Sequence, residues 1–220
     1  MMKTLKERIM EYMPNIKEED IFKNTITIAF AIAVISHNGQ YRDNGEPYFN
    51  HPKRLNIRYM ELMAIDDDHY VSKTTAILNG LPYEGVRELC FLHDVVEDTS
   101  TTHEEIRELY KEYGYGDFFD EYIDIPLKLI THDKNEPYES YISKVMTNPT
   151  ASLVKLIDLS DNLNPFGLMH LDDKSLKRSK RYLDYFKLIN DKYLFLAKIV
   201  NAKEMEKCNY DSETNNSGEA

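Results

Sequence analysis

The sequence predicts an all-α protein, folded as a helical bundle of roughly ten helices. Apolar residues recur at helical spacing, as at Leu5, Ile9 and Met13, whereas strict alternation of apolar and polar residues is hard to find. The eight glycines and eight prolines gather at separate points along the chain. These points divide it into helical segments of ordinary length.

The most apolar run, residues 26–35, is predicted to be a core helix. It is about half as long as the ~20 residues that a membrane-spanning helix needs, and polar residues follow it directly. Residues 36–50 are polar and contain both glycine and proline, which predicts a loop. Residues 50–52 predict the start of the next helix, because proline is tolerated in a first helical turn.

The rest of the chain predicts further helices and a tail. Residues 66–82 are polar, which favours a solvated loop or a short extra helix over a binding element. Residues 172–207 carry a long amphipathic pattern and are predicted to cover the core from outside. No linker or repeat interrupts residues 1–208, which predicts a single domain, whereas residues 209–220 lack apolar anchors, which predicts a disordered tail.

The composition narrows the class of protein. A chain of 220 residues that is 42% hydrophobic suits one globular domain or at most two. Its formal net charge of −11 argues against an electrostatic grip on nucleic acid. The two cysteines, Cys90 and Cys208, are too few for a disulfide framework and lack the spacing of a zinc site, so a reducing cytoplasm is the expected location. No export signal and no membrane partner is expected.

One segment of the sequence concentrates ionisable side chains. His93, Asp94, Glu97 and Asp98 interrupt an otherwise apolar pattern that predicts one helix over residues 91–99. At about 100° per residue, these four side chains fall within roughly 140° of one another around the helix. Carboxylates this close repel one another, and a divalent cation is the usual remedy. The segment therefore predicts a metal site.

Two further pieces complete the predicted site. Asp158 and Asn162 lie one helical turn apart in a second apolar helix and share a face. His51 stands at a predicted helix start. Two histidines and two carboxylates with open positions suit Mn²⁺, Fe²⁺ or Zn²⁺, and the share of oxygen ligands favours manganese.

Three motifs occur in a fixed order along the chain. They are His37-x-x-Gln40-x-Arg42-x-x-Gly45-x-Pro47-Tyr48-x-x-His51-Pro52, His93-Asp94-x-x-Glu97-Asp98-Thr99 and Lys155-Leu156-x-Asp158-x-x-x-Asn162. In this order they resemble the HD-domain phosphohydrolases of the RelA/SpoT type, which hydrolyse (p)ppGpp. The resemblance spans roughly residues 20–200, and it implies an all-helical HD domain that removes the 3′ pyrophosphate of guanosine 3′,5′-bis(diphosphate).

The resemblance also implies a role for each matching residue. One Mn²⁺ would be held by four side chains: His51, His93, Asp94 and Asp158. Glu97 and Asp98 would form the acidic pair that activates and orients water, Arg42 would pack on the guanine, and Asn162 would contact the ribose and phosphate side. His37 is not a ligand in that family and is expected to support the Arg42 loop. Tyr48 is expected to pack.

Some features depart from the family pattern. Asp43 stands where the family commonly has a basic residue, and it is expected to repel a tetra-anionic substrate. The 66–82 stretch is longer than the usual connection, and Asp161 replaces a frequent histidine. The length of 220 residues leaves no room for the synthetase domain of the long family members, so a small stand-alone hydrolase is expected.

Two alternatives stay open. One is an HD-domain phosphohydrolase of another nucleotide or of a phosphorylated cofactor, which Asp43 favours. The other is a catalytically silent module that binds a nucleotide, against which the intact Glu97 and Asp98 argue. A separate set of histidines is expected to be solvated or to cap helices: His69, His103, His132 and His170.

Overall fold

The structure, a computed structural model, describes residues 3–164 and 172–216 and is all-α over that part of the chain. Apart from helices, the described residues contain two isolated β-bridges, Tyr41–Pro47 and Ala64–Tyr70. The predicted fold class is confirmed. Ten α-helices of seven residues or more are described: α1 (Leu5–Tyr12), α3 (Thr25–Ser36), α4 (Asn50–Met63), α6 (Val86–Leu92), α8 (His103–Glu112), α10 (Asp124–Ile130), α11 (Tyr138–Val145), α12 (Pro149–Asn162), α13 (Asp173–Tyr193) and α14 (Phe195–Asn216).

Shorter helical pieces connect these helices. They are α2 (Glu18–Ile21), α5 (Lys73–Leu78), α7 (Val95–Asp98), α9 (Gly116–Phe118) and a π-helical turn, η1 (Phe119–Ile123). The helix α5 lies inside the polar 66–82 stretch, so the expected short extra helix is present. Its N-cap is Ser72, whose hydroxyl accepts a hydrogen bond from the backbone N–H of Thr75.

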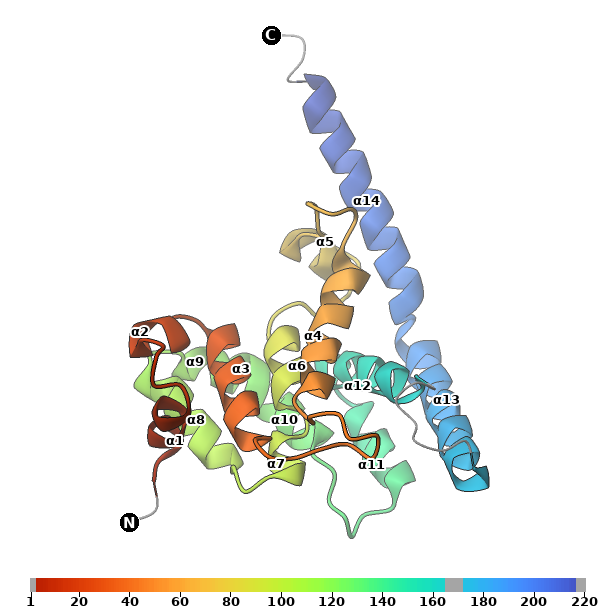
Figure 1. Cartoon of the computed structure of the whole chain (residues 1–220). Coiled ribbons are helices and arrows are strands. Elements are labelled where there is room, and N and C mark those ends of the chain that lie inside the picture. The colour runs from red at the N-terminus through yellow and green to blue at the C-terminus, as the bar shows by residue number, and fades with distance from the viewer. Residues whose placement is uncertain (1–2, 165–171, 217–220) are drawn as a thin grey trace.

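The helix α6 forms the centre of the bundle. It packs against α3, α4, α10 and α12 (Figure 1). Every residue of α6 except Arg87 is buried, which suits a helix that is apolar almost all round. Burial of each large apolar side chain, such as Leu89 or Leu92, stabilises the fold by about 1.5–3 kcal/mol. The C-terminal end of α6 is thereby fixed relative to α4 and α12.

The helix predicted over residues 91–99 is broken in the structure, so this expectation is wrong. The helix α6 ends at Leu92, and α7 begins only at Val95. At Asp94 the backbone departs from helical geometry, with φ −99° and ψ −6°. In a regular helix the side chains of His93 and Asp94 would point about 100° apart. The turn instead brings the Asp94 carboxylate to 3.0 Å from His93 Nε2.

The loop and the helix start predicted around residue 50 are confirmed. A tight turn over residues 42–46 is closed by two backbone hydrogen bonds, from the Arg42 N–H to the Glu46 carbonyl and from the Gly45 N–H to the Arg42 carbonyl. Gly45 takes the left-handed conformation, with φ +81°, that the turn requires. The helix α4 then begins at Asn50, with Pro52 in its first turn.

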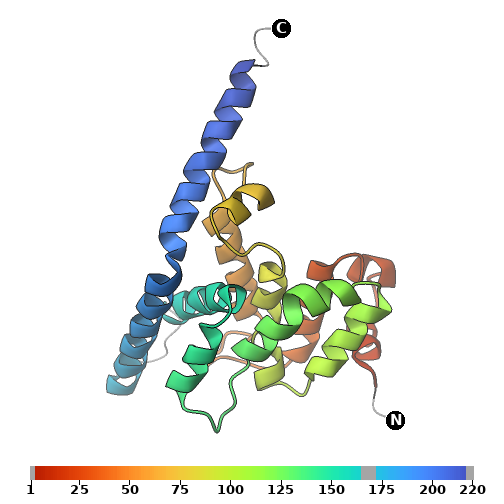
Figure 2. The same cartoon turned by 180° about the vertical axis from the view of Figure 1, so that it is seen from behind.

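Two C-terminal helices follow. The amphipathic segment 172–207 is not one helix, because Leu194 adopts a left-handed conformation, with φ 55°, that separates α13 from α14. The helix α13 packs on α12, although Ile189 is its one fully buried side chain. The helix α14 packs on α4 and α5 through Phe195, Ile199 and Ala202 and then projects beyond the bundle (Figures 1 and 2).

The far end of α14 overlaps the segment predicted to be disordered. The helix runs on to Asn216, so it includes residues 209–216, whereas residues 217–220 lie outside the described part of the chain. The assignment of residues 1–208 to a single domain stays a prediction. Over the described residues, no helix is long and apolar enough to cross a membrane.

A buried carboxyl group in α6 gives a stability prediction. Glu88 is 4% exposed, and its carboxyl accepts a hydrogen bond from the Thr25 hydroxyl at 2.5 Å. Burial raises the pKa of Glu88 above its ordinary value. The Glu88 carboxyl therefore binds a proton more tightly in the folded state than in the unfolded state. The stability that this proton contributes is lost as the pH rises through the pKa of Glu88 in the folded protein.

Glu88→Gln keeps an acceptor for Thr25 and removes the buried charge. We expect the variant to melt a few degrees above the parent protein at pH 8, with the gain shrinking toward zero near pH 4 because the parent carboxyl is then neutral as well. Melting curves across this pH range test it, with the exposed Glu104→Gln as control. A gain that does not depend on pH would contradict the prediction.

Candidate metal-dependent active site

Four side chains converge where α4, the end of α6 and α12 meet. His51 Nε2 lies 3.3 Å from His93 Nε2, 3.6 Å from Asp94 Oδ2 and 3.1 Å from Asp158 Oδ1. His93 Nε2 lies 3.0 Å from Asp94 Oδ2 and 3.9 Å from Asp158 Oδ1. The structure therefore brings together all four side chains that the motifs assign to a metal.

The chemistry of this donor set suits a divalent cation. His51, His93 and Asp158 are each at most 3% exposed, and the two histidines point ring nitrogens at one another, although at most one of these can donate a proton. His51, His93 and Asp94 alone place three ligand atoms within 4.8 Å of one another. Imidazole nitrogens and carboxylate oxygens at this spacing fit a first-row divalent metal.

The carboxylates around His51 favour a positive charge on its imidazole ring. Burial alone would lower the pKa of His51, but its hydrogen bonds to Asp158 and Asp161 raise that pKa to about 9. A proton on His51 therefore offsets part of the negative charge of the carboxylates. A metal ion bound at the same nitrogen would displace this proton.

Other groups orient the ligand side chains. His93 Nδ1 lies 3.1 Å from the Cys90 carbonyl oxygen, so a proton on Nδ1 leaves Nε2 free to bind a metal. The Tyr48 hydroxyl donates to Asp94 Oδ2 at 2.7 Å and to Asp98 Oδ2 at 3.1 Å. Tyr48 also packs on the His37 ring, at 4.7 Å between centroids. The expectation that Tyr48 packs is therefore correct, but it omitted the hydroxyl.

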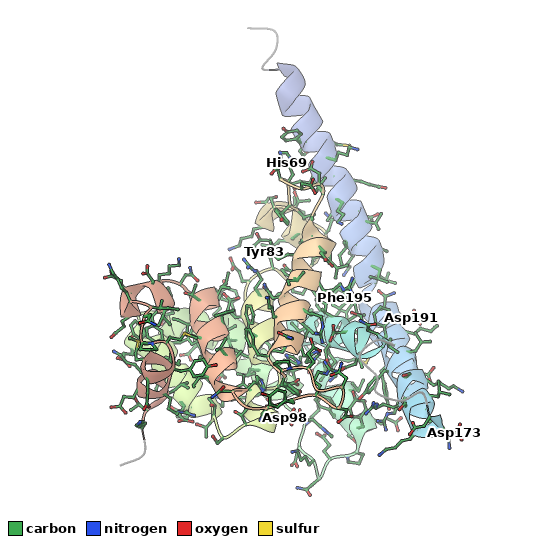
Figure 3. All side chains as sticks on the ribbon, viewed as in Figure 1. His69, Tyr83, Asp98, Asp173, Asp191 and Phe195 are labelled. Atoms are coloured by element: carbon green, nitrogen blue, oxygen red, sulfur yellow. The ribbon has the colours of Figure 1, made fainter. Side chains whose placement is uncertain are left out.

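The predicted acidic pair borders the same cavity. Glu97 and Asp98 both line a cavity of about 320 Å³ together with His51, Asp94 and Asp158. Figure 3 shows Asp98 at the lower end of α4, among side chains of the neighbouring loop. Glu97 Oε2 accepts a hydrogen bond from the backbone N–H of His132 at 2.9 Å. Burial raises the pKa of Glu97, which makes it a stronger proton acceptor than a solvated carboxylate.

The predicted nucleotide-binding residues lie at the cavity wall. The Arg42 guanidinium donates to Asn162 Oδ1 at 2.7 Å and lies 3.4 Å from Asp161 Oδ2. The Asn162 amide donates to Asp158 Oδ1 at 2.6 Å. Arg42 and Asn162 also line an adjoining cavity of about 340 Å³, and Asp43 lines both cavities.

Lys155 is a component of the site to which the sequence analysis gave no role. It is 9% exposed, and its Nζ donates to Asp158 Oδ2 at 2.8 Å. The ammonium also lies over the rings of Tyr138 and Tyr141, at 5.9 and 5.3 Å from their centroids. Burial alone would lower the pKa of Lys155, but the Asp158 carboxylate holds this pKa well above its ordinary value. The position of Lys155, three residues before Asp158, could have indicated this pair.

The remaining histidines have different surroundings. His132, expected to be solvated or to cap a helix, instead lines the same cavity as Glu97, and its Nε2–H donates to the Glu136 carbonyl oxygen at 2.9 Å. His37 is buried, with Nδ1 at 2.8 Å from Gln40 Oε1, in keeping with support of the Arg42 loop. His103 contacts Asp124, and His69 contacts Asp66. His170 lies outside the described residues.

The chain is similar in sequence to several known proteins. No family model matches the chain. Over 186 residues, 83% of the chain, it is 27% identical to a GTP pyrophosphokinase rsh of Brucella ovis. Over 180 residues it is 26% identical to a guanosine-3′,5′-bis(diphosphate) 3′-pyrophosphohydrolase of Aquifex aeolicus, and over 175 residues 26% identical to the bifunctional (p)ppGpp synthase/hydrolase SpoT of Escherichia coli.

The RelA/SpoT-type resemblance is confirmed. The chain spans about a fifth of the length of these RelA/SpoT-type relatives, with 21% or 22% of each covered. Among solved structures, one described as a metazoan ortholog of SpoT that hydrolyzes ppGpp matches with a TM-score of 0.50 and 20% identity, covering 83% of this chain and 95% of that chain. At this level of identity the match shows that the two chains share a fold.

The buried pair of Lys155 and Asp158 gives a second prediction. Lys155→Met removes the cation and leaves the Asp158 carboxylate without its ammonium partner. We expect the metal-free variant to lose about 3–5 kcal/mol of unfolding free energy, and Mn²⁺ to recover much of this loss because it neutralises the same carboxylate.

Urea unfolding with and without Mn²⁺ measures this difference. Lys128→Met is the matched control, because Lys128 forms an exposed ion pair with Asp124 at 2.9 Å, and little change is expected with or without metal. An equal loss for Lys155→Met in both conditions would show that Mn²⁺ does not bind at Asp158.

Proposed function

We propose that this chain is a metal-dependent phosphohydrolase that removes the 3′ pyrophosphate of ppGpp, with Mn²⁺ as its metal. The observation that carries the proposal is the convergence of four ligand side chains with a partly buried carboxylate, Glu97, in one cavity. The names of the Aquifex and Escherichia relatives support the substrate. The two free cysteines fit a reducing cytoplasm, and the partner is a small nucleotide.

The metal site would supply the electrostatic part of the chemistry. A bound divalent ion lowers the pKa of its water and offsets charge on a phosphate oxygen. His51, His93, Asp94 and Asp158 would hold this ion. Tyr48 and the Cys90 carbonyl would keep two of these side chains in place through the hydrogen bonds described above.

Glu97 would act as the general base. Its carboxylate lies in the cavity beside the ligand cluster, and the His132 N–H fixes one of its oxygens. The attacking water would pass a proton to Glu97 as its oxygen bonds to the phosphorus attached to the ribose 3′ oxygen. The bond between that phosphorus and the ribose oxygen would break, pyrophosphate would leave, and the ribose oxygen would take up a proton from solvent to become the 3′ hydroxyl. Asp98, exposed and bound by Tyr48, would orient the water.

Arg42 and Asn162 would hold the nucleoside. The hydrogen bond from Arg42 to Asn162 lies at the edge of the guanidinium, so a flat face of this cation stays available to stack on a base. The Asn162 amide spans Arg42 and Asp158, which places it between the proposed base site and the proposed metal.

A second candidate keeps the chemistry and changes the substrate. Asp43 lines both cavities, where its carboxylate would repel the second diphosphate of ppGpp. This observation favours a nucleotide or a phosphorylated cofactor with less charge at that end. Both candidates are hydrolases that depend on the same metal cluster and the same Glu97.

The deciding experiment is turnover of ppGpp by metal-stripped protein with and without Mn²⁺. We expect pyrophosphate release that requires Mn²⁺, because without a cation the pKa of the attacking water is not lowered and the charge on the phosphate oxygen is not offset. Assays of GTP and of other phosphorylated nucleotides run in parallel. Mn²⁺-dependent release from another nucleotide alone would replace the substrate, and Mn²⁺ binding without turnover of any of them would favour a silent binding module.

Glu97→Gln tests the proposed base separately from the metal. The variant keeps an acceptor for the His132 N–H but cannot take a proton from water. We expect kcat to fall by roughly 10²–10⁴-fold with Mn²⁺ content unchanged. Metal analysis and steady-state kinetics measure both, with Glu104→Gln on α8 as control. An unchanged kcat would remove Glu97 from the mechanism.

A further inference from the structure

Asp161, which departs from the family pattern, contacts a ligand side chain directly. Its Oδ2 lies 2.7 Å from Nδ1 of His51, the ring nitrogen that does not face the other ligands. The Asp161 side chain is 8% exposed. His51 and Asp161 come from α4 and α12, so their contact joins the two helices at the edge of the metal cluster.

Arg54 holds this carboxylate on both oxygens. Arg54 Nε donates to Asp161 Oδ1 at 2.7 Å, and a terminal nitrogen donates to Oδ2 at 3.0 Å. Another terminal nitrogen of Arg54 donates to Glu46, which lies in the loop before α4. A guanidinium fork with two bonds fixes the carboxylate plane as well as its position.

We propose that Asp161 is a positioning residue for His51: it accepts the Nδ1–H hydrogen bond and so fixes the imidazole ring with Nε2 aimed at the metal. An imidazole whose Nδ1 has no acceptor divides its proton between the two nitrogens and turns more freely. Carboxylate partners of this kind commonly orient metal-binding histidines. The inference rests on the metal binding in the proposed function and does not depend on the nucleotide.

Two causes could make Asp161 matter, and the chain offers variants that separate them. The first cause is charge: a carboxylate near the cluster attracts a cation whatever its orientation. Arg54 and Arg42 both contact Asp161, however, and offset its charge. Orientation instead requires an acceptor at Nδ1. Asp161→Asn removes the charge and keeps an oxygen that can accept, whereas Asp161→Ala removes both.

The experiment is Mn²⁺ titration of the full chain, with free Mn²⁺ followed by electron paramagnetic resonance. We expect Asp161→Ala to weaken Mn²⁺ binding by roughly 10–100-fold, and Asp161→Asn to weaken it clearly less. Asp43→Ala is the control for charge, because Asp43 lines the cavity whereas the partner of His51 Nδ1 is Asp161. This variant should change the Mn²⁺ affinity by less than either Asp161 variant.

Nitrogen-15 NMR of the zinc-loaded protein gives a readout independent of affinity. We expect a downfield, slowly exchanging Nδ1–H signal from His51, lost in Asp161→Ala and retained with a smaller downfield shift in Asp161→Asn. Equal loss of affinity in both Asp161 variants would assign the effect to charge and overturn the proposal, as would an unchanged affinity in Asp161→Ala.

The outcomes also separate this inference from the proposed function. If the parent chain binds no Mn²⁺, the proposed function fails. If the parent binds and Asp161→Ala binds equally well, the function stands and the role of Asp161 falls. Thermal melts report whether each variant folds, and the near-isosteric Asp161→Asn together with the NMR signal of the parent keeps the test decisive if Asp161→Ala does not fold.

Discussion

The structure depends on a group of charges buried where α4, α6 and α12 meet. The Asp158 carboxylate of α12 is almost fully buried, and a buried carboxylate without a partner would destabilise the fold. Lys155 compensates the charge at one carboxylate oxygen, and His51 lies near the other. The buried apolar residues of α6 pack beside this group and exclude water from that side. The three helices can therefore pack only in an arrangement that keeps these charges together.

The same arrangement gives the site its chemical asymmetry. The ligand atoms face inward from rigid helix ends, whereas Glu97 and Asp98 lie on the short helix α7 beside the cavity. Asp94 lies in the turn between α6 and α7, so the carboxylate that joins the cluster precedes the helix that carries Glu97 and Asp98. A continuous helix would have crowded all three on one surface. Burial then raises the pKa of Glu97, which suits proton transfer.

Much of this could be predicted from the sequence, for reasons that differ between residues. Helical periodicity and clustered glycine and proline predict the all-α fold, and the ordered motifs name the four side chains that converge. The break at Asp94 could not be predicted, since local propensity favours a continuous helix and the tertiary contact of Asp94 with Tyr48 overrides it. The contact of Asp161 with His51 joins residues 110 positions apart, and no local pattern reports such a pairing.

The clamp of Glu46, Arg54 and Asp161 has a consequence for how the sequence can change. Glu46 and Asp161 both bind Arg54, so loss of either carboxylate leaves a half-buried guanidinium with fewer partners. Substitutions at these three positions are thus expected to be non-additive, with the cost of one depending on the others. A histidine at position 161, frequent in the family, would meet Arg54 as a second cation. The three residues therefore form one electrostatic unit, and a cation at position 161 is expected to require a compensating change at Arg54.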